Sequence, residues 1–395
     1  MKQTVEKKTE GSCFGIGHPA NLKARREALG QTRRIVVKVG SAVLAGKKGL
    51  DPQAVSGLAG DVARLMKTGR EVIVVTSGAI AEGMRKMGIE ARPTEIPEKQ
   101  AVAAVGQAGL MREYEKAFFA RKIKVAQILL TRDDLTNRRR YLNARNTLQT
   151  LLSWGVAPIV NENDTVVVDE LKFGENDNLS AMVTHLMDAD LLVILTDTDG
   201  LYTKNPREYA DCSLISTVAA IGKDVLSLAS GGAGDMGTGG MASKLAAARK
   251  VTAAGIPVVV ANGKKPAILK SLFSGKEEGT FFMPGPKKIG GRKCWIAFAL
   301  KPSGALFLDR GAVEAVLRGG KSLLPVGVCG VRGDFGEGSA VECGSQNGPV
   351  IAVGLVNYNS AQIRRIMGRP TREIVKLLGH KPYDEVIHRD NLVLT

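Results

Sequence analysis

The sequence predicts an α/β fold, with a mainly parallel sheet sandwiched by helices, followed by a second, small and mostly β domain. Short apolar runs rich in β-branched residues, which are typical of strands buried on both faces, alternate with helical patterns. Near residue 280 the sequence pattern changes to short alternating strands separated by glycine turns. The six runs of the first domain are 35–40, 71–78, 124–131, 157–164, 190–197 and 257–263.

The segments between the runs carry ordinary helix signals. Asp51 and Pro52 form an N-cap and first-turn pair ahead of an apolar stripe that ends at Gly69. Apolar residues recur at helical spacing over 179–187, and another stripe begins at Met241. Helices between buried strands imply right-handed crossovers, and therefore parallel strand pairs.

We divide the chain into domains where the sequence pattern changes. Residues 35–280 form the α/β domain, 281–380 the small β domain with a short helix near 311–318, and 381–395 a C-terminal tail. Residues 1–34 are a basic N-terminal extension that we expect to be disordered.

Composition and charge restrict the class of protein. The 395 residues are 44% apolar and 24% charged, and no apolar run approaches the roughly 20 residues that a membrane helix needs. Without a recognisable secretory signal, we expect a cytoplasmic protein with no membrane partner. The five cysteines are scattered and lack Cys-x-x-Cys spacing, which argues against a disulfide framework or a zinc site. The net charge of +16 lies mainly at the two chain ends, where it fits nucleic acid contact or, more commonly, a solvated surface.

Polar or glycine residues follow every one of the six runs. Ligands of open parallel sheets bind beyond the carboxyl ends of the strands, so this edge is the candidate active site. The residues are Lys38 with Gly40 and Ser41; Thr76, Ser77 and Gly78; Thr131; Asn161, Asn163 and Asp164; Thr196 and Asp197; and Asn262 with Gly263.

Lys38 and Ser77 each allow two interpretations. Lys38 interrupts a buried strand, where a lysine needs an anion, either a bound phosphate or a structural carboxylate. Ser77 and Gly78 precede a helical pattern whose free amides suit a carboxylate or phosphate. An ordinary N-cap explains Ser77 equally well.

Two acid–amide clusters flank residues 165–173, which alternate like a strand and could return as a hairpin. They are NEND at 161–164 and GENDN at 174–178. Asp177 or Asn178 could simply cap a helix that starts near Leu179. Brought to one sheet edge, however, the clusters would bind an amino group or orient nearby lysines.

The glycine-rich stretch GGAGDMGTGGMASK, residues 231–244, is not a Walker A loop. Lys244 is preceded by Ser243, and no serine or threonine follows it to reach magnesium. Glycines still let backbone amides approach a phosphate at a helix N-terminus. We therefore predict a phosphate-binding segment at 238–244 after a mobile, lid-like loop at 231–237; the alternative is a simple connector.

The four histidines lie away from these clusters, so no Ser-His-Asp or Cys-His set can be assembled at the strand ends. Two lysines with glycine loops suit phosphoryl transfer, which depends mostly on positioning and charge stabilisation. A carboxylate acceptor would be ionised at pH 7 and would need no general base.

Several long motifs carry a resemblance to a known family. They are IVVKVGSAVL, VIVVTSGAIAEG, IVNENDTV, FGENDNLSA, ILTDTDGLYTKNP and GTGGMASKLAAA, and in this order they resemble the glutamate 5-kinases of the amino-acid kinase superfamily. The resemblance covers about residues 35 to 380 and leaves 1–34 outside it. Residues 292–368 resemble the family's PUA domain, a small β-barrel often found in RNA-modifying proteins.

The resemblance implies the amino-acid kinase fold and a reaction. ATP and Mg²⁺ would phosphorylate the side-chain carboxylate of L-glutamate to L-glutamyl 5-phosphate, the first step of proline biosynthesis. Lys38 and Lys244 would neutralise the moving phosphoryl group, and Asp177 would hold both lysines. Homo-oligomers and feedback inhibition by proline are further expectations from the family, and protein ligands of Mg²⁺ are not specified.

The resemblance also assigns binding residues. Ser77, Asp164 and Asn176 would bind glutamate. The residues assigned to ATP are Lys38, Thr196, Asp197, Thr238, Gly239, Gly240, Met241, Ala242, Ser243 and Lys244.

Two other functions compete with this one. An enzyme of the same fold could act on aspartate, N-acetylglutamate, carbamate or a nucleotide, but the PUA-like unit and the paired acid–amide clusters count against it. An RNA-binding or RNA-modifying protein could use the basic C-terminal domain, whose KKIGGRK stretch lacks the interleaved aromatics of a base-stacking surface. RNA therefore stays a candidate partner of that domain.

Overall fold

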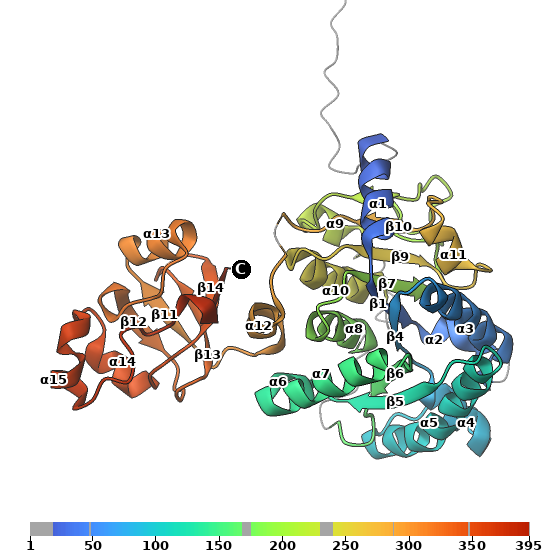
Figure 1. Ribbon diagram of the computed structural model, residues 1–395, viewed down its shortest axis with the longest axis horizontal. Helices are drawn as coiled ribbons and strands as arrows, with labels where there is room; N and C mark the ends of the chain where they lie inside the picture. The colour runs from blue at the N-terminus through green and yellow to red at the C-terminus, as the bar shows by residue number, and fades with distance from the viewer. Residues whose placement is uncertain are drawn as a thin grey trace, which may run out of the picture. The chain divides into compact units, whose positions relative to one another are not determined.

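The computed structural model describes residues 19–46, 49–167, 175–229, 240–286, 288–346 and 348–394 (Figure 1). The chain divides into two compact units, Met1–Lys288 and Ile289–Thr395. This division lies after the boundary at 280/281 that the sequence suggested. Phe281 and Phe282 belong to strand β10 of the first unit, where β10 pairs with β9, so the change in composition precedes the end of the sheet.

The described part of the first unit contains an eight-stranded sheet in the order β5-β6-β4-β1-β7-β9-β10-β8. The six predicted runs all form strands, and they pair in parallel from β5 to β9. The bounds are β1 Arg34–Val39, β4 Glu71–Val75, β5 Val125–Leu130, β6 Ala157–Glu162, β7 Leu191–Thr196, β8 Thr217–Val218, β9 Val258–Asn262 and β10 Thr280–Phe282. The predicted parallel α/β fold is therefore confirmed.

Helices cover the sheet in two layers (Figure 1). α3 packs against α5 and α11, and α8 packs against α10. Figure 1 shows α3 and α8 on opposite sides of the strands. The bounds are α1 Pro19–Gln31, α2 Ser41–Leu44, α3 Pro52–Lys67, α4 Ala79–Met87, α5 Ile96–Phe119, α6 Arg132–Thr136, α7 Arg138–Ser153, α8 Glu175–Leu186, α9 Lys223–Ser227, α10 Met241–Ala253 and α11 Ile268–Phe273. A small hairpin, β2 Ala45–Gly46 and β3 Gly49–Leu50, follows α2.

The core explains why the strands read as continuous apolar runs. β7 is buried at every position, and β1 is buried from Ile35 to Val39 because helices cover both faces. The predicted N-cap of α3 is confirmed, since the Asp51 side chain accepts a hydrogen bond from the Gln53 amide. No helix in the described ranges is long and apolar enough to cross a membrane.

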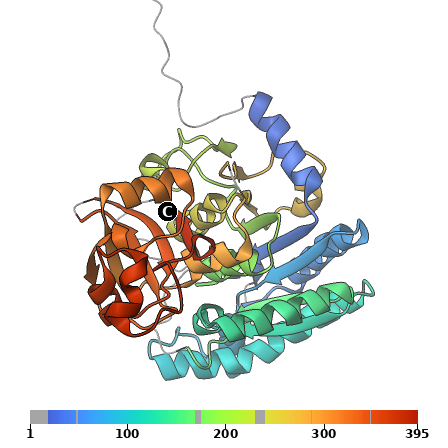
Figure 2. The ribbon, with the colours of Figure 1, turned by 60° about the vertical axis from the view of Figure 1, so that its left-hand side comes forward.

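Part of the N-terminal extension is helical, contrary to the expectation of disorder for residues 1–34. Helix α1 lies beside α11 in both views (Figure 1, Figure 2). Its Leu29 side chain is buried in the core, and the buried Arg25 guanidinium stacks over the Phe281 ring. Burial of these two side chains stabilises the helix through tertiary contacts, which its highly charged sequence did not predict. Residues 1–18 lie outside the described residues.

The second unit is mostly β, as predicted. Its described residues form a five-stranded sheet in the order β12-β11-β13-β14-β15, with α13 at the site of the predicted helix. The bounds are β11 Gly304–Leu308, β12 Val328–Arg332, β13 Ala340–Gly344, β14 Val350–Leu355, β15 Leu392–Leu394, α12 Gly291–Cys294, α13 Arg310–Gly319, α14 Ser360–Ile366 and α15 Ile374–Leu378.

The segment 381–395 is not a separate tail. Strand β15 pairs antiparallel with β14, and Val386 and Ile387 are fully buried in the core of the second unit. These apolar residues complete a sheet edge and a core, so their burial accounts for the ordered C-terminal segment.

Candidate functional site

Three predicted residues meet at the carboxyl end of β1. Asp177, in the first turn of α8, lies 2.5 Å from the Lys38 Nζ through Oδ1 and 3.5 Å from the Lys244 Nζ through Oδ2. Lys38 comes from β1 and Lys244 from the first turn of α10. The structure thus joins three segments that are far apart in the sequence, through one carboxylate.

All three side chains of this cluster are buried, and burial makes their net charge important. Asp177 is 0% exposed, and the two lysines are 4% and 5% exposed. Two ammonium groups share one carboxylate, so the three side chains carry one excess positive charge when all are ionised. A buried excess charge is costly unless an anion neutralises it, and this arrangement therefore suits an anionic ligand. The structure gives Lys38 the carboxylate partner of one interpretation, while a bound phosphate beside Lys38 stays a prediction.

Burial and charge act on the two partners differently. Burial by itself raises the pKa of Asp177, but the attraction of Lys38 and Lys244 outweighs burial, so the pKa of Asp177 lies below its usual value. Burial also lowers the pKa of Lys244, and the attraction of Asp177 only partly opposes this. The carboxylate is therefore ionised at neutral pH, and Lys244 gives up its proton more readily than an exposed lysine does.

The glycine-rich segment enters the cluster through its last residues. Gly240 is the N-cap of α10, and the Ser243 hydroxyl donates a hydrogen bond of 2.6 Å to Asp177 Oδ2. Met241 and Ala242 form the start of the helix, while Thr238 and Gly239 lie outside the described residues. Ser243 therefore supports Asp177, a contact that sequence reasoning did not anticipate.

A chain of neutral side chains lies beside the charged cluster. Asn176 Nδ2 donates to Ser77 Oγ over 3.1 Å and to Asn161 Oδ1 over 3.3 Å. Asn161 Nδ2 in turn donates to Gln107 Oε1 over 2.8 Å. Among the residues that the structure describes, no hydrogen-bond partner is found for the buried Asn176 Oδ1 or Gln107 Nε2. An unpaired buried amide is costly, so these atoms mark a place for a polar ligand or water.

The capping alternatives for Ser77 and Asp177 are not supported. The N-cap of α4 is Gly78, at φ 107°, and it makes no side-chain cap bond. Helix α8 begins at Glu175, so Asp177 lies within its first turn and directs its carboxylate to the lysines. Asp164 lies in the turn that follows β6. Residues 165–167 are turn and irregular backbone, and the rest of the predicted hairpin, 168–173, lies outside the described residues.

The ends of β7 and β9 meet β1 at the same edge. The Gly40 amide donates to the Leu195 carbonyl over 3.0 Å, and the Gly263 amide donates to the Thr196 carbonyl over 2.8 Å. Thr196 is buried and its hydroxyl donates to Asp197 Oδ1. A Cβ added at Gly263 would lie 2.7 Å from Val43 Cγ1, so only glycine fits where these chains converge.

Gln107 is a residue of the candidate site that the sequence analysis did not identify. It lies on α5, which follows none of the six apolar runs directly, so the strand-end rule could not find it. The signal in the sequence is a single polar side chain within the apolar stretch AVAAVGQAGL.

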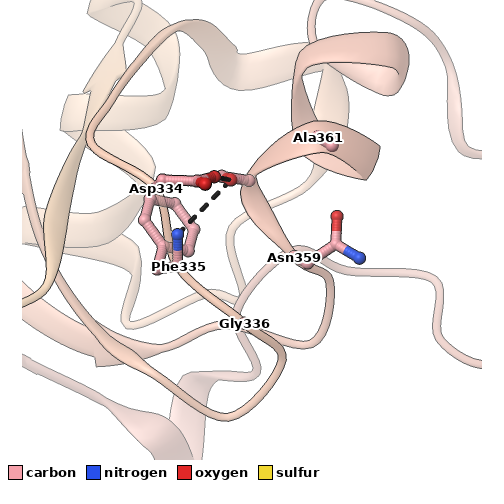
Figure 3. A pocket seen from close by; sticks show the side chains of 6 residues that line it. Asp334, Phe335, Gly336, Asn359 and Ala361 are labelled. Atoms are coloured by element: carbon pink, nitrogen blue, oxygen red, sulfur yellow. Dashed lines mark hydrogen bonds between the residues drawn. The ribbon is translucent and has the colours of Figure 1, made fainter.

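A pocket in the second unit contains none of the predicted site residues (Figure 3). It has a volume of about 420 Å³ and is lined by Asp334, Phe335, Gly336, Asn359, Ser360 and Ala361. The Phe335 amide donates to Ser360 Oγ over 3.4 Å, and Ser360 Oγ donates to Asp334. Asp334, Phe335 and Ser360 are thus bonded to one another, while the Asn359 side chain accepts from the Gln362 amide.

Comparisons with known proteins identify families that match both units of the chain. A model of the amino acid kinase family matches residues 33–262, and a PUA domain model matches residues 304–378. The chain is 52% identical over 371 residues to "Glutamate 5-kinase" of Geobacter sulfurreducens, covering 94% of this chain and 100% of the relative. The corresponding protein of Geobacter metallireducens is 52% identical with the same coverage. That of Syntrophus aciditrophicus is 49% identical over 370 residues, covering 94% and 96%.

Proposed function

Because the chain belongs to the glutamate 5-kinases of the amino acid kinase family, we propose how its residues carry out that reaction. The enzyme transfers the γ-phosphoryl group of ATP to the side-chain carboxylate of L-glutamate, giving L-glutamyl 5-phosphate, the first step of proline biosynthesis. The observation that carries our assignment of roles is the buried Asp177 carboxylate held between Lys38 and Lys244.

Lys38 and Lys244 stabilise the transferring phosphoryl group. A glutamate carboxylate oxygen forms a bond to the γ-phosphorus while the bond to the β–γ bridging oxygen breaks and ADP leaves. No proton moves in this step, since the acceptor is ionised at neutral pH. What the reaction needs is positive charge fixed in place before substrates arrive, and Asp177 fixes both ammonium groups. The Asp177 carboxylate lies 2.5 Å from the Lys38 ammonium and 3.5 Å from the Lys244 ammonium, so both charges are held beside the path of the phosphoryl group.

Glutamate binds along the neutral side chains. The unpaired Asn176 Oδ1 is an acceptor suited to the substrate ammonium group. Asp164, three residues after Asn161 in the sequence, supplies a negative charge for the same group. Ser77 and the free amides at the start of α4 suit the α-carboxylate. Glutamate is thereby recognised at the end of its molecule that does not react.

ATP binds at the ends of β7 and β9 and at the start of α10. Thr196, Asp197 and residues 238–244 are the proposed contacts, with backbone amides before Lys244 facing phosphates. Mg²⁺ supplies charge neutralisation on the ATP phosphates. In the described ranges, no group of three or more His, Cys, Asp or Glu side chains gathers as a metal site. Mg²⁺ usually keeps several waters and binds through substrate phosphates and one or two carboxylates. Among the residues proposed to contact ATP, Asp197 is the one with a carboxylate.

Two further features are proposed from the family alone: the enzyme forms homo-oligomers, and proline inhibits it by feedback. A cytoplasmic location and RNA as the partner class of the PUA domain are proposed as well.

A trapping assay tests the reaction and its acceptor. ATP and hydroxylamine are supplied with glutamate, aspartate or N-acetylglutamate, and hydroxamate is measured, with Lys38→Ala as the control. Hydroxamate from glutamate alone, lost in Lys38→Ala, supports the proposal. Turnover of another acceptor would overturn the substrate assignment, and unchanged turnover in Lys38→Ala would overturn the role of the lysine.

A further inference from the structure

A buried carboxylate outside the reaction centre ties the β2–β3 hairpin to α4. Glu82, on α4, is 3% exposed, and it pairs with Arg85 through two contacts of 2.6 and 2.9 Å. The backbone amide of Leu50 in β3 also approaches this carboxylate. A buried carboxylate needs such partners, and here one partner belongs to the hairpin.

Arg85 holds the same strand from its other side. Gly49 adopts a φ of 111°, and a Cβ at this position would lie 2.2 Å from Arg85 Cδ. The stem of Arg85 therefore crosses the backbone of β3 while its guanidinium binds Glu82. Together Glu82 and Arg85 form what we call the α4 clasp on Gly49 and Leu50.

The helix that carries the clasp is itself rigidly supported. A Cβ at Gly83 would lie 1.9 Å from the Val102 carbonyl oxygen, and one at Gly106 would lie 1.7 Å from the Ala79 carbonyl oxygen. α4 and α5 therefore approach as closely as their backbones permit. The hairpin is thus fixed to a firm base rather than to a helix free to shift.

The clasped strand lies against the start of α4, next to the proposed glutamate site. A Cβ at Gly78 would lie 3.3 Å from Leu50 Cδ2, so the Leu50 side chain packs against the residue that follows Ser77. The base of the hairpin is closed by a hydrogen bond of 2.8 Å from the Asp51 amide to the Leu44 carbonyl. The segment from Lys38 through this hairpin is therefore joined to the Ser77–Gly78 turn at Leu50.

We propose that Glu82 is a positioning residue for glutamate binding, which acts by holding Leu50 against the Ser77–Gly78 turn. This inference rests on the proposed glutamate site at Ser77 and Asn176. Loss of the carboxylate releases the Arg85 side chain that packs on Gly49 and lets β3 leave Gly78, so the Ser77–Gly78 turn loses the packing that fixes it. The phosphoryl-transfer residues Lys38, Asp177 and Lys244 keep their own contacts, so the effect falls on glutamate binding.

The test compares Glu82→Ala and Glu82→Gln with the matched control Glu90→Gln, which changes an exposed carboxylate just after α4. We expect Glu82→Ala to raise the KM for glutamate about tenfold, the effect of losing one hydrogen bond to a charged group. Glu82→Gln, which keeps one acceptor oxygen, has a smaller effect, and the KM for ATP stays within about twofold. A merely structural role would lower the melting temperature without this separation of the two KM values.

Hydrogen exchange of the Leu50 amide gives a second measurement that does not depend on activity. The amide exchanges slowly in the wild-type chain and faster in Glu82→Gln, whereas Glu90→Gln matches the wild type. If Glu82→Ala does not fold, Glu82→Gln and its exchange decide the question. A folded Glu82 variant with wild-type KM for glutamate and wild-type exchange at Leu50 overturns the inference.

Ser77→Ala separates this inference from the proposed function. If Ser77→Ala leaves the KM for glutamate unchanged, the proposed glutamate site is wrong and the clasp loses its target. If Ser77→Ala raises that KM while both Glu82 variants do not, only the role of Glu82 is wrong.

Discussion

The proposed active site has a charged half and a neutral half, and two adjacent residues of α8 divide them. Asp177 faces Lys38 and Lys244, while Asn176 faces Ser77 and Asn161. The charged half holds positive charge ready for a phosphoryl group, whose transfer is governed by electrostatics. The neutral half offers directional donors and acceptors, which discriminate between ligands by geometry. Changes in the charged half should therefore affect kcat, and changes in the neutral half should affect the KM for glutamate.

The largest expected effect is in Lys244→Ala. Loss of one preorganised charge at a developing anion typically lowers kcat about 10²–10³-fold. We expect a fall of this size, with a much smaller change in the KM for glutamate, in steady-state kinetics of the purified variant. A variant in which only the KM for glutamate changes would place Lys244 in the neutral half and contradict the division.

Asp177→Asn should destabilise the protein, since it leaves two buried ammonium groups without their carboxylate. Breaking a buried ion pair by removing one partner costs about 3–5 kcal/mol. Urea unfolding should show a loss of this order, and a non-hydrolysable ATP analogue should restore more stability to Asp177→Asn than to the wild type, since its phosphates replace the missing anion. Equal stability of the variant and the wild type without ligand would show that the lysines do not depend on Asp177.

Asn176→Ala tests the neutral half. It removes the unpaired Oδ1 proposed for the substrate ammonium group and leaves the adjacent Asp177 in place. We expect the KM for glutamate to rise about tenfold or more, as for a lost hydrogen bond to a charged group, with kcat reduced far less. The matched control is Asn178→Ala, whose side chain binds Lys250 on α10 instead. Similar effects of the two substitutions on the KM for glutamate would argue against a specific contact by Asn176.

The sequence revealed residues at strand ends and helix starts more fully than residues inside helices, and the reason is physical. Parallel strands bring their carboxyl ends to one edge, so Lys38 and Ser77 could be located from their positions at the ends of apolar runs. Gln107 and Glu82 lie on helices, and their partners, Asn161 and Leu50, become neighbours only when helices pack on the sheet. No local sequence pattern predicts a contact that forms only through this packing.

The same distinction applies to the fold. The strands of the first unit are local apolar runs and could be predicted, whereas α1 and β15 depend on partners elsewhere in the chain. α1 is supported by burial of Leu29 and Arg25, and β15 by pairing with β14. Short or weakly amphipathic segments of this kind form only in their tertiary context.

The smallest expected effect is a shift of the alkaline limb of the pH profile, and it too belongs to the charged half. Burial lowers the pKa of Lys244 below its ordinary value of 10.5, against the opposing attraction of Asp177. The proposed mechanism needs the protonated Lys244 ammonium. We therefore expect kcat/KM to be maximal below the lowered pKa and to fall as the pH rises through it. This fall comes at a lower pH than the titration of an ordinary lysine. In Lys244→Arg the guanidinium stays charged, so this limb should move to higher pH even if the maximal rate is lower. Profiles of kcat/KM for ATP between about pH 7 and 11 measure both, and an unchanged limb in Lys244→Arg would assign the titration to another group.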